Sequence, residues 1–319
     1  MKKPMSPPDF KEILGSVDKR EFLEILDKVT TPIIKGKYLH WDELRHRIPP
    51  DGLTHEQWWL GLKWHRVSAA KPVPLEDIKG EGFHYMHTDP IFESLHQIDM
   101  GAGGYIQMPP EITNRETRDR YYISSLIEEA ITSSQLEGAA TTREVAKEML
   151  RTNRTPRDRS ERMILNNFLT MKRIGELKDE PMSHDLVLEI HRIITEQTLD
   201  DLSAVGRLRK PSEDIAVWSH DNLLLHRPPA AHELEGRMTS MCEFANGKPT
   251  GYFVHPIIRA IVLHFWLAYD HPFCDGNGRT ARALFYWSML HSNFWLFEFI
   301  SISSVLRKAP AQYTRSFLH

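Results

Sequence analysis

Apolar residues recur at helical spacing through most of the chain after residue 114, and this spacing restricts the possible folds more than any other feature. One helix is predicted from Arg115 to Leu136, because Tyr122, Leu126 and Ala130 fall on a single face of such a helix. The same spacing predicts further helices over 160–178, 183–198, 230–246, 255–270 and 279–291. A chain with this pattern is expected to be mostly α-helical.

One segment breaks the helical pattern. The apolar runs 215–218 and 223–226 flank a polar turn, Ser219–Asn222, which predicts a short β-hairpin over about 214–227. Residues 1–114 are predicted to form a mainly helical N-terminal region. Large aromatic residues usually serve packing, so its core is expected to rest on tryptophans. These are Trp41, Trp58, Trp59 and Trp64.

The predicted class is therefore mostly α, with one short hairpin after an N-terminal helical region. We expect residues 115–319 to carry the chemistry and assign no role to residues 1–114.

The composition is that of a water-soluble globular protein, with 41% hydrophobic and 26% charged residues in 319. The formal net charge of −3 lacks the strongly basic character typical of nucleic-acid binding, so no nucleic-acid or membrane partner is expected. Two cysteines do not indicate a disulfide framework. No secretory signal is apparent in residues 1–10, and the apolar stretch 283–300 is too interrupted by polar residues to span a bilayer. A cytoplasmic location is expected.

Residues 271–282 read His-Pro-Phe-Cys-Asp-Gly-Asn-Gly-Arg-Thr-Ala-Arg and carry the most specific signal in the chain. A glycine-rich turn that leads into a helix N-terminus forms an anion site, because its backbone N–H groups converge there. Gly276 and Gly278 permit positive φ angles and the close approach of a phosphate. Arg279 and Arg282 lie three residues apart, on the same side of the predicted helix. Two guanidinium groups beside such a turn indicate a polyphosphate ligand.

Two neighbouring side chains complete a reactive site. Asp275 offers one hard oxygen ligand, which is sufficient for Mg²⁺ when phosphate oxygens supply the others. His271 titrates near neutral pH and can accept a proton from an attacking hydroxyl. A base, a metal ligand and a phosphate cradle within one short segment are typical of phosphoryl or nucleotidyl transfer.

A zinc site is the weaker interpretation of the same histidines. No Cys-x-x-Cys or His-Glu-x-x-His pattern accompanies His255, His264 and His271. We interpret His264 as a core histidine and Cys274 as a variable spacer.

Residues 271–282 resemble the full signature of the Fic family with no substituted position, and the resemblance covers roughly residues 115–310. It implies a Fic-type helical bundle that transfers AMP from ATP and Mg²⁺ to a Ser, Thr or Tyr hydroxyl of a protein, which can be the chain itself. Relatives that act as kinases depart from Gly-Asn-Gly at the turn, so AMP transfer is favoured. The resemblance implies that His271 is the base, that Asp275 holds Mg²⁺, and that the phosphates are bound by Gly276, Asn277, Gly278, Arg279 and Arg282.

Two further segments resemble parts of the family. Ser133-Ser-Gln-Leu-Glu-Gly138 is similar to the inhibitory motif that precedes the catalytic core in one class of the family. The resemblance implies that Glu137 pairs with Arg282 and occupies the place of the ATP γ-phosphate; the alternative is a helix-end Glu beside a glycine terminator. The hairpin corresponds to the family's flap, which docks the target, although a purely structural hairpin is the other interpretation. Its candidate docking residues are Val217, Trp218, Leu223 and Leu224.

Three questions stay open at this point. The same residues could remove AMP from a modified protein, with Glu137 orienting a water. A regulatory module that only binds nucleotide is a second alternative, although it would not need His271. Relatives often form dimers, and many continue into a winged-helix region after the helix expected over 309–319, so oligomeric state and target identity are left open.

Overall fold

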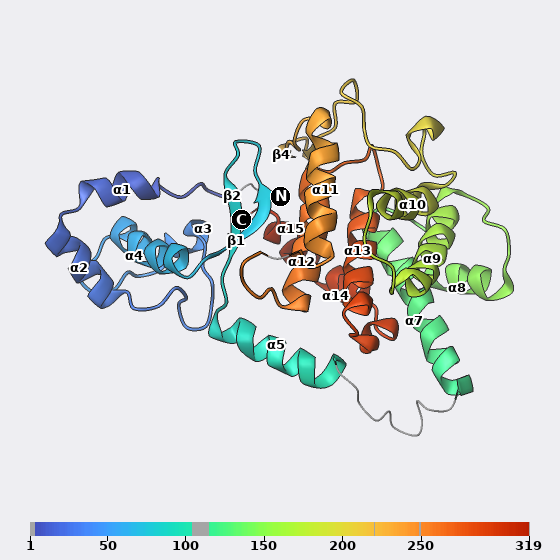
Figure 1. The fold of residues 1–319 in the computed structure, drawn as a ribbon, viewed down its shortest axis with the longest axis horizontal. Coiled ribbons are helices and arrows are strands. Elements are labelled where there is room, and N and C mark those ends of the chain that lie inside the picture. Colours follow the sequence, from blue (N-terminus) through green and yellow to red (C-terminus); the bar gives the residue numbers. More distant parts are fainter. Residues whose placement is uncertain (1–3, 104–114, 220, 249, 319) are drawn as a thin grey trace. The chain divides into compact units, whose positions relative to one another are not determined.

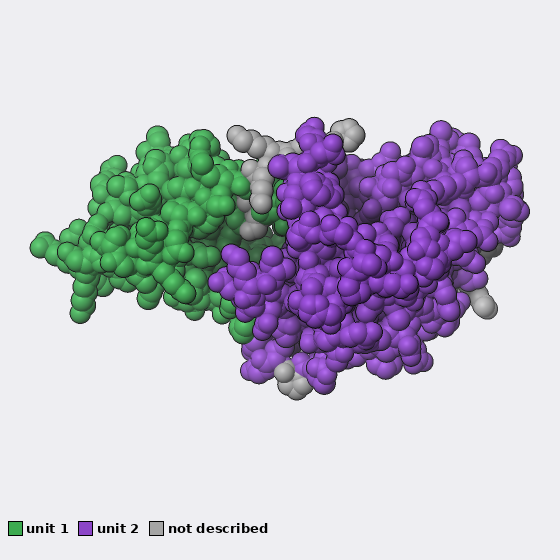
Figure 2. All heavy atoms as spheres, turned by 90° about the horizontal axis from the view of Figure 1, so that it is seen from above, with its two compact units in different colours: residues 1–73, 82–97, 315–319 green, residues 74–81, 98–314 purple. Residues whose placement is uncertain are grey.

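The computed structural model describes residues 4–103, 115–219, 221–248 and 250–318. The chain divides into two compact units (Figure 2). Unit 1 comprises residues 1–73, 82–97 and 315–319, and unit 2 comprises residues 74–81 and 98–314. The functional division expected after residue 114 falls at the edge of an undescribed segment and stays a prediction.

The N-terminal part of the chain is mainly helical, as predicted. Side chains that accept hydrogen bonds from the first turn begin three of its helices: Asp9 accepts from Glu12 N–H, and Asp18 accepts from Glu21 N–H. Thr54 forms a reciprocal capping box with Gln57. The elements are α1 Phe10–Ser16, α2 Lys19–Lys28, α3 Trp41–Leu44, α4 His55–Ser68, β1 Lys71–Glu76, β2 Gly82–Tyr85 and α5 Asp89–Ala102 (Figure 1).

The predicted tryptophan core is present in unit 1. Trp58 and Trp59 are buried in one cluster with aliphatic residues of α1, α2 and α4, and Trp41 packs edge-on against Trp59. Trp64 is 36% exposed and contacts the ring of Phe22. Three of the four predicted tryptophans therefore pack the core of this unit, and Trp64 lies outside that cluster.

A second hairpin, formed by β1 and β2, was not expected from the sequence. Pro72 and Pro74 argue against a strand, because proline cannot donate to a sheet. Here they are two residues apart, so their missing N–H groups face the same edge of β1, and the other edge pairs with β2. Val73 and Leu75 alternate with the prolines and are buried.

Unit 2 carries the helices that the sequence predicted. The first runs from Arg115 to Leu136, as expected, and Ser183 is an N-cap that accepts a hydrogen bond from Leu186 N–H. The other boundaries agree with those expected or differ by up to three residues, and a 3-10 turn begins the helix expected at residue 230. The elements are α7 Arg115–Leu136, α8 Arg143–Thr152, α9 Arg159–Leu177, α10 His184–Thr195, η1 Leu202–Ala204, β3 Val217–Trp218, β4 Leu224–His226, η2 Ala231–Glu233, α11 Leu234–Ala245, α12 Pro256–Asp270, α13 Asn277–His291, η3 Trp295–Glu298, α14 Ile302–Lys308 and α15 Pro310–Ser316.

The core of unit 2 lies around α13, which packs against α12, α9 and α10 (Figure 1). Trp266 of α12 and Trp287 of α13 are almost completely buried. α7 packs along α9 and α14, so its C-terminal end reaches the start of α13. No helix among the described residues is long and apolar enough to cross a membrane.

The basic segment 151–162 has the composition of a solvated linker, but an ion pair orders it. Arg154 donates two hydrogen bonds to the carboxylate of Glu161, at 2.9 and 2.8 Å, and Glu161 is only 3% exposed. The last residues of the segment already belong to α9. The sequence did not predict this pair, because it depends on the burial of Glu161, and that burial depends on how α9 packs.

Candidate active site

α12 ends at His271, whose φ of 44° places it in the left-handed region. Its backbone carbonyl accepts a hydrogen bond from Arg209 Nε at 3.0 Å. The ring Nδ1 lies 3.4 Å from the carbonyl oxygen of Ala268, which fits a tautomer with the proton on Nδ1 and a lone pair on Nε2. The expectation that His271 titrates near neutral pH is wrong: burial lowers its pKa to about 4, so the ring is neutral at neutral pH and can accept a proton.

The glycine-rich turn places backbone N–H groups at the start of α13. Gly276 has a φ of 82°, and a Cβ at this position would lie 2.7 Å from Thr195 Cγ2. The side chain of Asn277 does not point into the turn. It accepts from Phe273 N–H at 3.0 Å and donates to Phe273 O at 2.8 Å. Asn277 therefore holds the turn in shape, and only its backbone is left for the predicted phosphate contact.

Asp275 is the exposed carboxylate of this turn. Its side chain is 48% exposed, and Oδ2 lies 3.5 Å from Arg159 Nη2. No group of three or more potential metal ligands exists among the described residues. One accessible carboxylate nevertheless suits Mg²⁺, because this ion takes one or two protein carboxylates together with phosphate oxygens and water.

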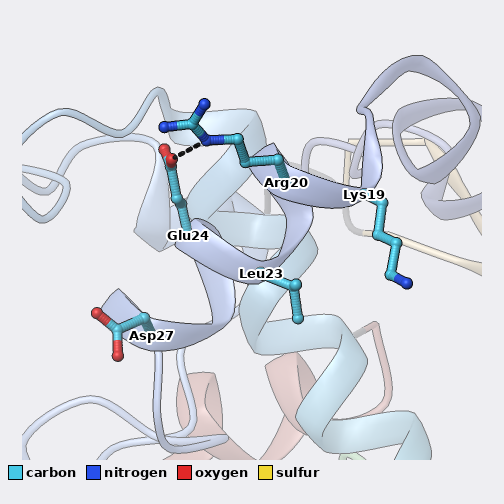
Figure 3. A pocket seen from close by; sticks show the side chains of 5 residues that line it. All are labelled: Lys19, Arg20, Leu23, Glu24 and Asp27. Atoms are coloured by element: carbon cyan, nitrogen blue, oxygen red, sulfur yellow. Dashed lines mark ion pairs between the residues drawn. The ribbon is translucent and has the colours of Figure 1, made fainter.

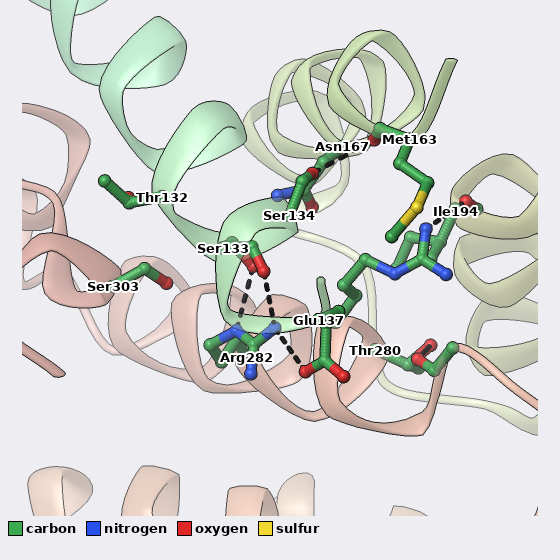
Figure 4. A network of polar contacts seen from close by, with 12 residues as sticks. Thr132, Ser133, Ser134, Glu137, Met163, Asn167, Ile194, Thr280, Arg282 and Ser303 are labelled. Carbon is green, nitrogen blue, oxygen red and sulfur yellow. Dashed lines mark hydrogen bonds and ion pairs between the residues drawn. The ribbon is translucent and has the colours of Figure 1, made fainter. Parts of the chain in front are cut away.

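Arg282 meets the end of α7, as the resemblance implied (Figure 4). Its Nη2 lies 2.8 Å from Glu137 Oε1 and 3.0 Å from Ser133 O, and its Nε donates to Ser133 Oγ at 2.8 Å. Arg282 is 4% exposed, whereas the Glu137 side chain is 33% exposed. Burial alone would lower the pKa of Arg282, but Glu137, together with Tyr313 and Glu129, outweighs this effect and raises it. α7 ends at this contact, since Gly138 has a φ of 91°.

The carboxylate of Glu137 also lies directly against the turn. A Cβ added to Gly278 would be 2.1 Å from Glu137 Oε1 and 2.9 Å from its Cδ. A side chain at position 278 would therefore collide with Glu137. The position of this carboxylate, above the first turn of α13 and beside Arg282, is where an anion bound to the turn would place negative charge.

The side chain of Arg279 is buried beside the turn. It is 1% exposed and donates through Nη1 to the carbonyl oxygen of Ile194 at 3.0 Å. Its Nε has no hydrogen-bond partner among the described residues. Burial lowers its pKa, with the charges of Asp275 and Glu137 acting in the opposite direction. The sequence predicted that Arg279 and Arg282 share a side, but it did not predict that both are buried.

His191 of α10 is a site residue that sequence reasoning missed. Its ring stacks on Phe273 at a centroid distance of 3.7 Å. Nε2 lies 3.0 Å from Asp275 O, and Nδ1 accepts from Gly206 N–H at 3.1 Å. Burial lowers its pKa to about 4, so the ring that contacts Phe273 and Asp275 of the turn is neutral at neutral pH. Only its place on the apolar stripe of the helix could have signalled this role.

The hairpin is attached to the end of α12. β3 and β4 pair antiparallel with a bulge after Val217, and His226 of β4 contacts the carbonyl oxygen of Tyr269 through Nε2 at 2.6 Å. Trp218 and Leu223 are 56% and 42% exposed, while Val217 and Leu224 are partly buried. The predicted hairpin is confirmed, and it is fixed two residues before His271.

The other residues of the zinc interpretation have separate partners. His255 Nε2 lies 2.9 Å from Asp99 Oδ2, and His264 Nε2 lies 3.0 Å from Tyr313 Oη. Cys274 is partly buried, and burial raises its pKa to about 11. These contacts agree with the interpretation of His264 as a core histidine.

Comparison with known proteins identifies the domain. Residues 181–289 match the model of the Fic/DOC family. The chain is 36% identical over 117 residues to the protein adenylyltransferase Fic of Nematostella vectensis, covering 37% of this chain and 25% of that protein. It is 30% identical over 127 residues to the protein adenylyltransferase fic-1 of Caenorhabditis elegans, covering 40% of this chain and 23% of that protein. The chain thus spans about a quarter of the length of these relatives.

Solved structures agree with this result at the level of the fold. A Fic family protein from Desulfovibrio desulfuricans G20 superposes with a TM-score of 0.58 at 19% identity, over 72% of this chain and 66% of that one. A Fic domain containing signaling protein from Bacteroides thetaiotaomicron superposes with a TM-score of 0.55 at 20% identity, over 70% and 80%. The family match, the relatives and the helical fold agree: this chain contains a Fic/DOC family domain over residues 181–289.

Proposed function

We propose that this chain is a protein adenylyltransferase that moves AMP from ATP to a hydroxyl group of a protein. The observation that carries the proposal is a neutral His271 beside the glycine turn that begins α13. The turn can hold phosphates, and the imidazole can remove a proton from the attacking group. The names of the relatives in Nematostella vectensis and Caenorhabditis elegans support the same activity.

The proposed reaction is an in-line displacement at the α-phosphorus. His271 Nε2 takes the proton of a Ser, Thr or Tyr hydroxyl, and the oxygen forms a bond to the α-phosphorus. The bond to the oxygen that bridges the α- and β-phosphates breaks, and pyrophosphate leaves with that electron pair. The backbone N–H groups of residues 276–278 stabilise the developing negative charge.

Asp275 is the residue that would hold Mg²⁺, which supplies positive charge to the phosphate oxygens when it is bound. Arg159 must move or share this carboxylate, because its guanidinium already lies 3.5 Å away. The half-exposed side chain leaves room for such an exchange.

Glu137 acts in this proposal as a built-in inhibitor. Its carboxylate pairs with Arg282 and touches Gly278, so it competes with the terminal phosphate of ATP for the same guanidinium and the same space. ATP can still bind, but not with its γ-phosphate on Arg282 as long as Glu137 stays. Removing Glu137 should therefore raise the rate of productive AMP transfer.

The hairpin is the proposed docking element for the target. A protein segment can add as an extra strand to β3 or β4, and the exposed Trp218 and Leu223 can hold its side chains. His226 links this hairpin to the backbone beside His271, so the docked hydroxyl would be presented to the base. Target identity and dimer formation stay predictions.

Incorporation of label from α-phosphate-labelled ATP tests the proposal. We expect label on the chain or on a lysate protein to rise by at least tenfold in Glu137→Gly, because the competing carboxylate is gone. The double variant Glu137→Gly, His271→Ala should lose this gain. Glu180→Gly is the matched control, since Glu180 is an exposed glutamate after a helix end and far along the chain from the turn.

Two results would contradict the proposal. Full transfer activity in His271→Ala would remove the assignment of the base. Equal labelling of Glu137→Gly and wild type would remove the inhibitory role of Glu137 while leaving AMP transfer itself intact.

AMP removal is the second candidate, and one observation favours it. Only Oε1 of Glu137 takes part in the pair with Arg282, and the described structure gives Oε2 no hydrogen bond. This oxygen can orient a water toward a modified target, while His271 returns the proton to the leaving hydroxyl. Release of AMP from a modified protein by wild type, but not by Glu137→Gly, would establish this direction.

A further inference from the structure

A cavity of about 620 Å³ opens within unit 1, far along the chain from the residues of the Fic site. α4, the β1–β2 hairpin, the start of α5 and the segment before α3 contribute its wall. Its size lies within the range of small-molecule sites, about 300–1,000 Å³. Most of its lining is apolar or aromatic, and the residues that matter below are Tyr38, Lys63, Arg66, Val67, His84 and Ile91.

Two positively charged side chains, Lys63 and Arg66, line this cavity. Lys63 and Arg66 are three residues apart on α4, so they project from the same side of the helix. Arg66 is 4% exposed, and its guanidinium carbon lies 3.8 Å from the centre of the Tyr38 ring. It donates to Pro32 O and Leu39 O, each at 2.9 Å. The guanidinium is thus held rigidly by carbonyl groups and an aromatic ring.

No carboxylate balances these two charges. The lining of the cavity contains no Asp or Glu, and neither Lys63 nor Arg66 forms an ion pair with any residue that the structure describes. Burial, together with the neighbouring charge of Arg66, lowers the pKa of Lys63. Partial burial of two like charges costs free energy, and a bound anion would recover it.

The surface of α2 shows the opposite arrangement (Figure 3). A shallow hollow there is lined by residues of this helix alone, and its charges are of both signs. Arg20 Nε and Glu24 Oε1 lie 3.4 Å apart with side chains 90% and 61% exposed. These charges are solvated and compensate one another, so this hollow indicates no ligand.

We propose that the cavity of unit 1 binds a small organic anion, in which a carboxylate or phosphate is attached to an aromatic or apolar body. Lys63 and Arg66 bind the anionic group, and the rings of Tyr38 and His84 with Ile91 contact the body. All of these residues belong to unit 1, so the proposal does not depend on the proposed transfer activity.

Three matched probes test this site on the full chain: 4-fluorobenzoate, 4-fluorophenyl phosphate and the neutral 4-fluorobenzyl alcohol. Fluorine NMR gives their dissociation constants. We expect at least one of the two anions to bind at least tenfold more tightly than the alcohol, because only an anion interacts with both cations. The preferred anion shows whether the natural ligand carries a carboxylate or a phosphate.

Two variants and a control assign the binding to the cavity. Lys63→Gln should weaken the preferred anion by at least fivefold and leave the alcohol unchanged. Val67→Trp should weaken all three probes by filling the space, and it is a safe change because Val67 is 53% exposed. Lys19→Gln, the same change at an exposed lysine of α2, should have no effect.

The proposal is overturned if the alcohol binds as tightly as both anions, or if none of the probes binds. It is also overturned if Lys63→Gln leaves anion binding unchanged, since the anion would then be bound elsewhere, for example at the glycine turn of unit 2.

Discussion

Two groups of buried cations in this protein differ in how their charge is balanced. Arg282 in unit 2 pairs with Glu137 at 2.8 Å, and that carboxylate lies against Gly278 of the glycine-rich turn. Arg66 in unit 1 is surrounded by carbonyl groups and aromatic rings, and neither Arg66 nor Lys63 pairs with a carboxylate of any residue that the structure describes. Among the residues that the structure describes, the first site contains a carboxylate and the lining of the second contains none.

The difference determines how an anionic ligand can reach each group of cations. In the proposed function, the γ-phosphate of ATP must displace Glu137 from Arg282, so productive binding can be regulated through α7, which carries Glu137. A ligand of the unit 1 cavity meets no competitor, so its affinity depends only on the cavity itself. Changes in stability and in ligand affinity can test this difference between the two sites.

Acid should have the largest effect, because it adds positive charge to buried neutral histidines of unit 2. Burial lowers the pKa of His191 and His271 to about 4 and that of His264 to about 3. Below the unfolded value of about 6.5, the unfolded chain binds more protons than the folded one, so stability falls as pH falls. Asp270, whose pKa burial raises to about 6, acts in the opposite direction. We expect a net loss of about 4 kcal/mol between pH 7 and pH 5.

Urea unfolding followed by tryptophan fluorescence at three pH values measures this loss. His264→Gln should flatten the pH dependence, whereas His232→Gln, at an exposed histidine, should not. A stability independent of pH would show that the histidines are not held neutral by burial.

Arg282→Met should destabilise the fold by about 3 kcal/mol, because Glu137 and Ser133 lose their partner in a largely buried site. Chemical unfolding of the full chain gives the value. Arg120→Met on the exposed side of α7 should change stability by less than about 0.5 kcal/mol. Equal values for the two variants would mean that the Glu137 pair contributes nothing to α7 packing.

Glu137→Gln should raise affinity for a non-hydrolysable ATP analogue about tenfold, or about 1.4 kcal/mol, because the amide no longer competes as an anion. Isothermal titration calorimetry measures the change. Lys63→Gln should not alter this affinity. A higher affinity of Lys63→Gln for the ATP analogue would show that the two cationic sites are energetically coupled.

Lys63→Gln should have the smallest effect on folding. Removing one of two like charges should stabilise the protein slightly, by about 0.5 kcal/mol, as measured by urea unfolding. The exposed Lys19→Gln should leave stability unchanged. A loss of more than 1 kcal/mol would mean that Lys63 has a folding role that the contacts of the cavity do not show.

Local patterns in the sequence were sufficient for most of the fold. The bounds of α7, the N-cap at Ser183 and the hairpin around Ser219–Asn222 follow from periodicity, capping and turn residues, which act over a few positions. The β1–β2 hairpin was missed because Pro72 and Pro74 argue against a strand unless their orientation toward one edge is known.

The sequence was also sufficient to place a histidine, a carboxylate and a glycine turn within one short segment, residues 271–282, from which the proposed chemistry was predicted. Tertiary structure decided which charges meet. Glu137 and Arg282 are 145 positions apart, and their contact depends on how α7 packs beside α13. The neutral state of His271, the support of the turn by His191 and the unbalanced Lys63 and Arg66 likewise come from burial, which no local pattern encodes.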